Sequence, residues 1–270
     1  MRPEISFIGA GKMVSAMVSS LIRSEIYIPD QIACCSAKDG TSETLSTATG
    51  IQRFEGVDEM LKQKPDLLIL GCKPQQLSEL PPSTLESTED CLVLSIMAGI
   101  TLSRLDQSFP KSRNIVRSMP NTPGQIGQGV TGYLFLQEAN EKDKAVISKV
   151  LSSLGIAYLL SEEIDIDKVT AISGSGPAYL FEFACALEEA GVGIGLEPKI
   201  AKNLAIQTII GSARLMEASD SHPEELRNQV TSPNGTTQAA LESFSSDKLR
   251  EIVQRAALAA RNRSRELSNA

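Results

Sequence analysis

The chain has 270 residues, 41% of them hydrophobic and 22% charged, a composition typical of a globular protein long enough for one large domain or two ordinary ones. Its 26 Lys and Arg residues against 33 Asp and Glu residues give a net charge of −7, which argues against a general nucleic-acid-binding protein because phosphate contacts need excess cations. The sequence has neither an apolar run of the roughly 18 residues that a membrane helix needs nor the apolar core of a signal peptide, so we expect a cytoplasmic protein with no membrane partner.

Short apolar runs alternate with amphipathic segments through about residue 160. The apolar runs predict strands at Ile5–Ile8, Gln31–Cys35, Asp66–Gly71, Cys91–Ile96, Asn114–Ser118 and Gly129–Leu136. The amphipathic segments predict helices at Lys12–Arg23, Ser42–Thr49, Val57–Lys62, Gln75–Leu80 and Leu102–Ser108. This alternation is typical of βαβ units, so we expect an α/β domain of Rossmann type with a mainly parallel sheet over residues 1–162.

Strand patterns stop near residue 162, and helical periodicity replaces them. Leu, Ile and Ala recur about every three to four residues in Gly176–Ala190, Glu197–Ala218, Pro223–Asn228 and Asp247–Leu267. We therefore expect an all-α second domain over residues 163–270. Because these helices are apolar on more than one face, we expect them to pair with a second copy in a homodimer.

The cysteine and histidine content limits the chemistry. The five cysteines (Cys34, Cys35, Cys72, Cys91 and Cys185) show no metal-binding spacing, so we expect reduced thiols and no metal site. The single histidine, His222, lies in a segment typical of a helix start, and any Ser-His-Asp triad would need it. An enzyme with this sequence would therefore rely on something other than a histidine base.

A glycine-rich turn follows the first predicted strand, in FIGAGKMV at residues 7–14. Gly9 permits a tight turn, and Gly11 lets a pyrophosphate approach the N-terminus of the following helix. Val14 stands at the third glycine of the dinucleotide fingerprint, so the match is incomplete. The strand before it and the helix after it favour a dinucleotide site over a purely structural turn. The residues expected around the pyrophosphate are Gly9, Ala10, Gly11, Lys12 and Met13.

The end of the second predicted strand distinguishes the two nicotinamide cofactors. NAD sites typically place an acid there to accept from the ribose 2′-hydroxyl, whereas this chain has Ser36 and Lys38 before its first acid, Asp39. A hydroxyl and an ammonium suit a 2′-phosphate, so we predict NADPH, with NADH as a weaker alternative. A solvated surface side chain is the competing interpretation of Lys38.

Later strand ends supply further candidate contacts, because ligands of open parallel sheets bind outside the carboxyl ends of the strands. Cys72, Lys73 and Pro74 follow the third predicted strand, and Pro74 fits the first turn of a helix. Met97 and Asn121 follow the next two strands. Beyond them, ISGSGPAY at residues 172–179 predicts a helix capped by Ser175 and, because two glycines are more than a cap needs, a close approach of the backbone to cofactor or partner.

Five segments, taken in order, resemble the pyrroline-5-carboxylate reductase family: FIGAGKM (7–13), CKP (72–74), RSMPNTP (117–123), ISGSGPAY (172–179) and VTSPNGTT (230–237). The last two are the specific ones, and the resemblance covers nearly the whole chain. It implies NAD(P)H-dependent reduction of L-1-pyrroline-5-carboxylate to L-proline, the last step of proline biosynthesis. It also implies a C-terminal helical domain that interlocks with its partner's in a homodimer, with decamers of five dimers in some members.

The resemblance places the substrate between the nicotinamide and a C-terminal loop at the dimer interface. Carried over, the backbone amides around Gly235, Thr236 and Thr237, with the Ser232 hydroxyl, hold the substrate carboxylate. The Thr237 hydroxyl hydrogen-bonds the ring nitrogen, which makes Thr237 the expected catalytic residue. A protonated cyclic imine accepts hydride without a strong protein acid, which agrees with the absence of a histidine base.

Three residues depart from the family pattern. Asn234 stands where the loop commonly has glycine, although Asn tolerates a left-handed backbone better than other side chains do. Asp58 replaces an Asn that often lies near the adenosine ribose. Met97 stands where small residues are usual, which suggests a tighter nicotinamide pocket.

Two other functions remain open at this point. One is a related imine or β-hydroxyacid reductase, but Lys199 and Lys202 lack the sequence setting of the β-hydroxyacid dehydrogenase lysine. The other is a paralogue that binds nucleotide without turnover, which the intact Ser232, Gly235 and Thr237 disfavour.

Overall fold

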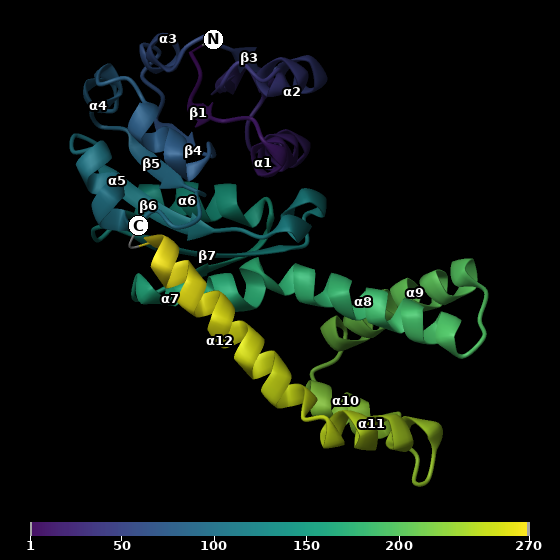
Figure 1. Cartoon of the computed structure of the whole chain (residues 1–270). Coiled ribbons are helices and arrows are strands. Elements are labelled where there is room, and N and C mark those ends of the chain that lie inside the picture. Colours follow the sequence, from purple (N-terminus) through teal and green to yellow (C-terminus); the bar gives the residue numbers. More distant parts are fainter. Residues whose placement is uncertain (1, 269–270) are drawn as a thin grey trace. The chain divides into compact units, whose positions relative to one another are not determined.

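The computed structural model describes residues 2–268, apart from the side chains of residues 85 and 86. It divides into two compact units (Figure 1). Unit 1 comprises Met1–Ser175 with Ala260–Ala270, and unit 2 comprises Gly176–Ala259. None of the helices in the described part of the chain is long and apolar enough to cross a membrane.

Unit 1 is built on one sheet with the strand order β3-β2-β1-β4-β5-β6-β7-β8. Every strand pair is parallel except β6 with β7, and the order reverses between β1 and β4, which creates a crevice at their carboxyl ends. The predicted α/β Rossmann-type fold is confirmed. The strands are β1 Ile5–Ile8, β2 Ile32–Cys35, β3 Gln52–Arg53, β4 Leu67–Leu70, β5 Leu92–Ser95, β6 Asn114–Met119, β7 Gly129–Phe135 and β8 Gly155–Leu159.

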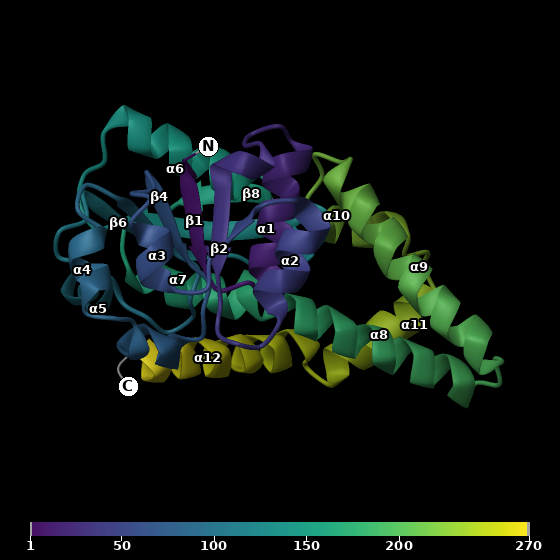
Figure 2. The same cartoon turned by 90° about the horizontal axis from the view of Figure 1, so that it is seen from above.

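Helices cover both faces of this sheet (Figure 2). Apolar side chains of α1, α2 and α6 pack on one face, and those of α3, α5 and α7 pack on the other, so β1, β2, β4 and β5 are buried along their whole length. The helices of unit 1 are α1 Lys12–Arg23, η1 Pro29–Gln31, α2 Thr41–Thr49, α3 Val57–Leu61, η2 Pro74–Glu79, α4 Ser83–Ser87, α5 Leu102–Ser108, η3 Thr122–Ile126, α6 Glu141–Ser152 and α7 Ile164–Val169.

The segment after α7 differs from the sequence-based expectation. Thr170–Gly174 forms one π-helical turn, η4, and the Ser175 N–H donates to Thr170 O at 2.8 Å. Ser175 has φ −86° and ψ −22°, which are right-handed helical angles rather than the extended angles of an N-cap. The prediction that Ser175 caps a helix is therefore wrong. The wide turn carries the helical backbone through the Gly-rich segment.

Unit 2 is entirely helical, which confirms the predicted fold class of the C-terminal part. Its helices are α8 Gly176–Gly193, α9 Pro198–Glu217, α10 Pro223–Gln229, α11 Thr236–Ser246 and the first part of α12 Leu249–Ser268. α8 and α9 pack against each other (Figure 1). Large apolar side chains on them stay exposed, including Leu180, Phe181 and Leu204, while the buried hydrophobic residues of the unit, Ala201 and Ala205, are small.

The last residues of α12 belong to unit 1 and dock on its core. Ser264 Oγ donates to the buried Asp167 carboxylate at 2.6 Å. Arg117, which is 3% exposed, donates to Ser268 Oγ at 3.2 Å and pairs with Glu163 at 2.6 Å. These polar contacts fix the end of the helix to β6 and α7.

Candidate active site

A groove of about 550 Å³ lies at the carboxyl ends of β1, β2 and β4. This is the crevice that the reversed strand order creates, where open α/β sheets bind nucleotides. Residues of four segments line it: Gly9, Ala10 and Gly11 after β1; Ser36, Ala37, Asp39 and Thr41 after β2; Glu55, Gly56 and Val57 after β3; and, after β4, Gly71, Cys72 and Lys73 with Gln76 and Glu79 of η2.

The two glycines after β1 have different roles. Gly9 has φ +104°, and a Cβ on it would lie 2.6 Å from the Gly71 carbonyl and 2.7 Å from the Cys72 nitrogen. Gly9 is therefore required by the fold itself. Gly11 is the N-cap of α1, and a Cβ there would meet nothing within 4 Å. The space beside Gly11 leaves the amides of the first turn of α1 open to an incoming phosphate.

Val14 occupies the third position of the glycine fingerprint, and Gly71 provides the room for it. A Cβ on Gly71 would lie 2.3 Å from Val14 Cγ2. Val14 is 1% exposed and joins the core between α1 and the sheet. A third glycine at position 14 would normally permit close packing of the helix on the sheet. In this chain the glycine at that contact is Gly71, directly after β4.

The end of β4 presents a thiol and a cation to the groove. Cys72 Sγ lies 3.7 Å from the sulfur of Met97, and burial raises the pKa of the Cys72 thiol to about 11. Cys72 is therefore a neutral thiol at physiological pH. Gln76 Oε1 accepts from the Lys73 N–H at 2.9 Å, and Pro74 begins η2, which leaves the Lys73 side chain exposed at the rim.

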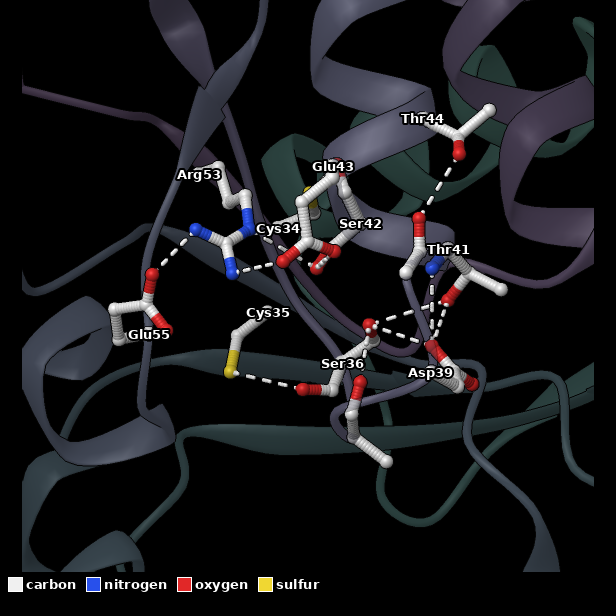
Figure 3. A network of polar contacts seen from close by, with 12 residues as sticks. Cys34, Cys35, Ser36, Asp39, Thr41, Ser42, Glu43, Thr44, Arg53 and Glu55 are labelled. Carbon is white, nitrogen blue, oxygen red and sulfur yellow. Dashed lines mark hydrogen bonds and ion pairs between the residues drawn. The ribbon is translucent and has the colours of Figure 1, made fainter.

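A network of hydroxyls gathers around Asp39 after β2 (Figure 3). Asp39 Oδ1 accepts from the Thr41 hydroxyl at 2.6 Å, the Thr41 N–H at 3.0 Å and the Ser36 hydroxyl at 3.3 Å. The hydroxyls of Ser36 and Thr41 lie 3.1 Å apart. Hydrogen bonding, above all from the Thr41 hydroxyl, lowers the pKa of Asp39, so its carboxylate is charged at neutral pH.

Beside this network, Arg53 of β3 is held by two carboxylates (Figure 3). It forms an ion pair with Glu55 at 2.5 Å and a second with Glu43. The hydrogen bond from Arg53 lowers the pKa of Glu55. Lys38 is exposed on the same loop as Asp39. This end of the groove thus carries several charges of both signs.

The other residues predicted around the cofactor have varied environments. Lys12 lines an adjoining hollow of about 800 Å³ that shares Ala10 and Gly11 with the groove. Met13 is partly buried against the core, and Met97 is 3% exposed. The Asn121 amide donates to Ser173 O at 2.9 Å and accepts from Val130 N–H at 2.8 Å. Asn121 ties η3 to η4, and its contact with a cofactor stays a prediction.

The sequence did not single out several groove residues. Thr41, Glu55 and Val57 line the groove, and the glutamate and the valine follow β3, a strand of two residues that gives no periodic signal. Asp58, expected near the ribose, accepts a hydrogen bond from Ser83 Oγ. The sequence feature that could have indicated Thr41 is Asp39-Gly40-Thr41, shortly after the buried strand β2. Such residues favour a turn followed by a helix.

In unit 2, the segment after α10 forms the turn that the sequence predicts. The Gly235 N–H donates to Ser232 O at 3.0 Å, and a Cβ on Gly235 would lie 2.9 Å from Ser232 Oγ. Asn234 has φ +58°, the left-handed conformation expected for the residue that replaces the common glycine. Thr236 begins α11. The N–H groups of Thr236 and Thr237 therefore have no carbonyl four residues earlier in the helix.

This turn is held from the helix that follows it. The Asn234 N–H donates to Gln238 Oε1 at 2.8 Å, and Gln238 Nε2 donates to Glu242 Oε1 at 2.7 Å. Since the Gly235 N–H is already used inside the turn, the amides of Thr236 and Thr237 are the better candidates to bind an anion.

His222 serves as a helix cap. Its Nδ1 accepts from the Glu224 N–H at 3.2 Å at the start of α10, as the sequence suggested. Among the described residues no cluster of His, Cys, Asp and Glu has the arrangement of a metal site.

Comparisons with known proteins assign the family. Residues 163–267 match the family model for pyrroline-5-carboxylate reductase dimerisation, and residues 4–99 match the model described as NADP oxidoreductase, coenzyme F420-dependent. The pyrroline-5-carboxylate reductase of Pseudomonas aeruginosa is 36% identical over 269 residues, which cover 98% of this chain and 97% of that protein. This chain belongs to the pyrroline-5-carboxylate reductase family.

Other pyrroline-5-carboxylate reductases share the sequence and the fold. The Methanosarcina acetivorans enzyme is 34% identical over 98% of this chain and 97% of its own length. The Coxiella burnetii structure matches with a TM-score of 0.91 at 31% identity, over 99% of each chain. The Plasmodium falciparum structure, which has NADP bound, matches with a TM-score of 0.84 at 28% identity over 98% of each chain. This chain therefore contains the dimerisation domain of the family.

Proposed function

We propose that this protein reduces L-1-pyrroline-5-carboxylate to L-proline with NADPH as the preferred cofactor and NADH as a weaker one. The observation that carries the proposal is the end-to-end match to reductases of this name, 36% identical over 98% of the chain, together with the intact Ser232, Gly235 and Thr237 of the C-terminal loop. The cytoplasm is the proposed location.

The groove of unit 1 has the features that a dinucleotide needs. Gly11 provides a position where no side chain blocks the N-terminus of α1, and the groove crosses the point where the strand order reverses. We assign the pyrophosphate to Gly9, Ala10, Gly11, Lys12 and Met13, the 2′-phosphate to Ser36 and Lys38, and the rest of the cofactor to Cys72, Lys73, Pro74, Met97 and Asn121. When bound, the cofactor supplies hydride from its nicotinamide ring to the protonated imine.

The loop before α11 is the proposed substrate clamp. The first-turn amides of Thr236 and Thr237, with the Ser232 hydroxyl, would hold the carboxylate, and the positive end of the α11 dipole favours that anion. The Thr237 hydroxyl would orient the ring nitrogen. Holding both reactants at near-attack distance can lower a barrier by roughly 7–11 kcal/mol, whereas proton transfer contributes about 10²–10⁴-fold, so alignment should dominate.

The proposed assembly is a homodimer through unit 2, with a decamer of five dimers as the larger alternative. Its support is the exposed apolar surface of α8 and α9, which includes Phe181 at 66% and Leu180 at 57% exposure. We place the boundary between the Rossmann domain (1–162) and the helical domain (163–270) where the dimerisation model begins. Light scattering measures the assembly directly.

One assay separates the proposal from its alternatives. Purified protein is given NADPH with L-1-pyrroline-5-carboxylate, and oxidation is followed by nicotinamide absorbance. A β-hydroxyacid reductase would instead reduce NADP⁺ when given hydroxyacids. A paralogue without turnover would bind the dinucleotide and give no reaction with either substrate, and that outcome would refute the proposed function.

A further inference from the structure

The loop after β2 carries the carboxylate of Asp39. NADPH and NADH differ at the ribose 2′ position, which is expected beside this loop. In a Rossmann fold the ribose 2′ position lies beside the end of the second strand. Here that end is followed by Ser36 and then by Asp39, whose carboxylate lines the groove. Its oxygen Oδ1 accepts from the Thr41 hydroxyl at 2.6 Å and from the Thr41 N–H at 3.0 Å (Figure 3).

These donors are of the kind that a phosphate monoester uses. Hydroxyls and a backbone N–H at the start of a helix suit a dianionic phosphate. α2 begins at Thr41, so the Thr41 N–H belongs to its first turn. In this chain the Asp39 carboxylate already occupies that N–H and that hydroxyl, and it lies 3.3 Å from the Ser36 hydroxyl.

Of the cations at this end of the groove, the exposed Lys38 favours a 2′-phosphate, whereas Arg53 is already engaged. Arg53 is paired with Glu43 and Glu55 on its two terminal nitrogens. Three carboxylates, from Asp39, Glu55 and Glu79, line the groove together with the cation of Lys73. A 2′-phosphate entering this end therefore meets like charge as well as the cationic groups that favour it.

We propose that Asp39 is a specificity-determining residue that weakens the preference for NADPH by occupying, with its own carboxylate, the Thr41 donors available to the 2′-phosphate. NADPH binding must displace the carboxylate from Thr41 and tolerate its charge. NADH brings a 2′-hydroxyl, which can donate to Asp39 without repulsion. The inference rests on the proposed function for the location of the cofactor, but it concerns binding rather than turnover.

The test compares two probes that differ only at the 2′ position, ADP-ribose and its 2′-phosphate, by calorimetry on the full-length protein. Asp39→Asn removes the charge, and Asp39→Ala also removes the acceptor. Both should raise the affinity ratio of the phosphorylated over the plain probe by about tenfold, because a like charge beside the phosphate is lost. Asp30→Asn is the matched control: Asp30 precedes β2 in η1, at the opposite end of the strand. Its ratio should stay at the wild-type value.

A double-mutant cycle tests the competition for Thr41. If Asp39 occupies the Thr41 hydroxyl, Thr41→Val weakens binding of the phosphorylated probe more in the Asp39→Ala background than in the wild type. Additive effects, or a ratio that stays constant or falls in both Asp39 variants, would overturn the proposal. Because the probes carry no nicotinamide, a shifted ratio in a protein that fails to reduce pyrroline-5-carboxylate would refute the proposed function and leave this inference standing.

Discussion

The backbone N–H of Asn234 and the side-chain amide of Gln238 are joined by a 2.8 Å hydrogen bond that ties the loop before α11 to the first turns of that helix. Glu242 in turn accepts from the Gln238 amide at 2.7 Å, which fixes which end of that amide faces the loop. Gln238 touches the loop without belonging to the proposed set of substrate contacts. We therefore regard it as a positioning residue for the clamp.

Gln238→Ala should raise KM for pyrroline-5-carboxylate by about fivefold, because a lost hydrogen bond of about 1 kcal/mol lets the turn move. The KM for NADPH should not change, since the cofactor groove is in unit 1. Steady-state kinetics with each substrate varied in turn measures both values. Gln254→Ala, an exposed glutamine on α12, is the control. Equal changes in both KM values would point to a general loss of structure instead.

Asn234 is the position where the clamp departs from the common family sequence. Its φ of +58° costs a β-carbon-bearing residue roughly 1 kcal/mol more than glycine, and Asn tolerates it better than Ala. Asn234→Ala should therefore lower kcat/KM for pyrroline-5-carboxylate severalfold. Asn234→Gly should also change kcat/KM, because it removes a side chain from the turn and frees the backbone. Unchanged kinetics in both variants would show that the turn does not contact the substrate.

Thr237 is the residue assigned to the ring nitrogen. Thr237→Ala should lower kcat/KM by about 10²-fold, the lower end of what a positioned proton-transfer group contributes. The dissociation constant for NADPH, measured by nicotinamide fluorescence, should stay close to that of the wild type. Thr237→Ser keeps the hydroxyl and should recover most of the activity. Full activity in the alanine variant would remove Thr237 from the mechanism.

Gly9 should tolerate no side chain. In Gly9→Ala the new Cβ would overlap the Gly71 carbonyl and the Cys72 nitrogen at 2.6–2.7 Å, in a backbone conformation of φ +104°. Since both neighbours are backbone, relief requires β1 and β4 to separate, and we expect a loss of several kcal/mol in the free energy of unfolding. Urea denaturation measures it. Gly11→Ala is the comparison: it has open space, so it should fold normally and weaken dinucleotide binding.

Buried thiols should make the protein sensitive to alkali. Burial raises the pKa of Cys34 and Cys72 to about 11 and that of Cys91 to about 12, from an ordinary value of 9.0. The folded state thus holds these protons at a pH where the unfolded chain has released them. The free energy of unfolding should fall as the pH rises from about 9 towards 12.

Urea denaturation of the wild type and Cys91→Ala at pH 8 and at pH 10.5 checks this expectation. Cys91→Ala creates a cavity and should be less stable at both values, but its loss of stability between them should be smaller than that of the wild type. Parallel losses would contradict the expected contribution of Cys91.

The sequence was most informative where an element is buried on a regular period. Ile5–Ile8 and Lys12–Arg23 were predicted with their observed bounds, because a run of buried residues and a 3.6-residue apolar stripe are strong signals. β8 was not predicted: Ile156, Tyr158 and Leu159 are more than half exposed on it, so the edge strand lacks the burial pattern of its neighbours. The helix α6 was also missed, although Asn140 caps it by accepting from Asp143 N–H.

The site could be predicted where motif glycines and strand ends coincide. Gly9, Gly11, Ser36 and Cys72 all line the observed groove. The contacts around Asp39 could not be predicted, because they depend on a left-handed turn at Gly40 that brings Thr41 back to the carboxylate. The hydrogen bond from the Asn234 N–H to the Gln238 side chain could not be predicted either, because such a contact produces no periodic pattern in the sequence.

The contact between Val14 and Gly71 couples substitutions at two positions of this chain. A Cβ at position 71 would lie 2.3 Å from Val14 Cγ2 and 3.3 Å from Ile96 Cδ1, so a side chain there requires these neighbours to shift. Gly71→Ala alone should be disruptive, whereas the same change after Val14→Gly should be tolerated. The two positions, 57 apart in the chain, are therefore coupled sterically: each limits the size of the side chain that the other can carry.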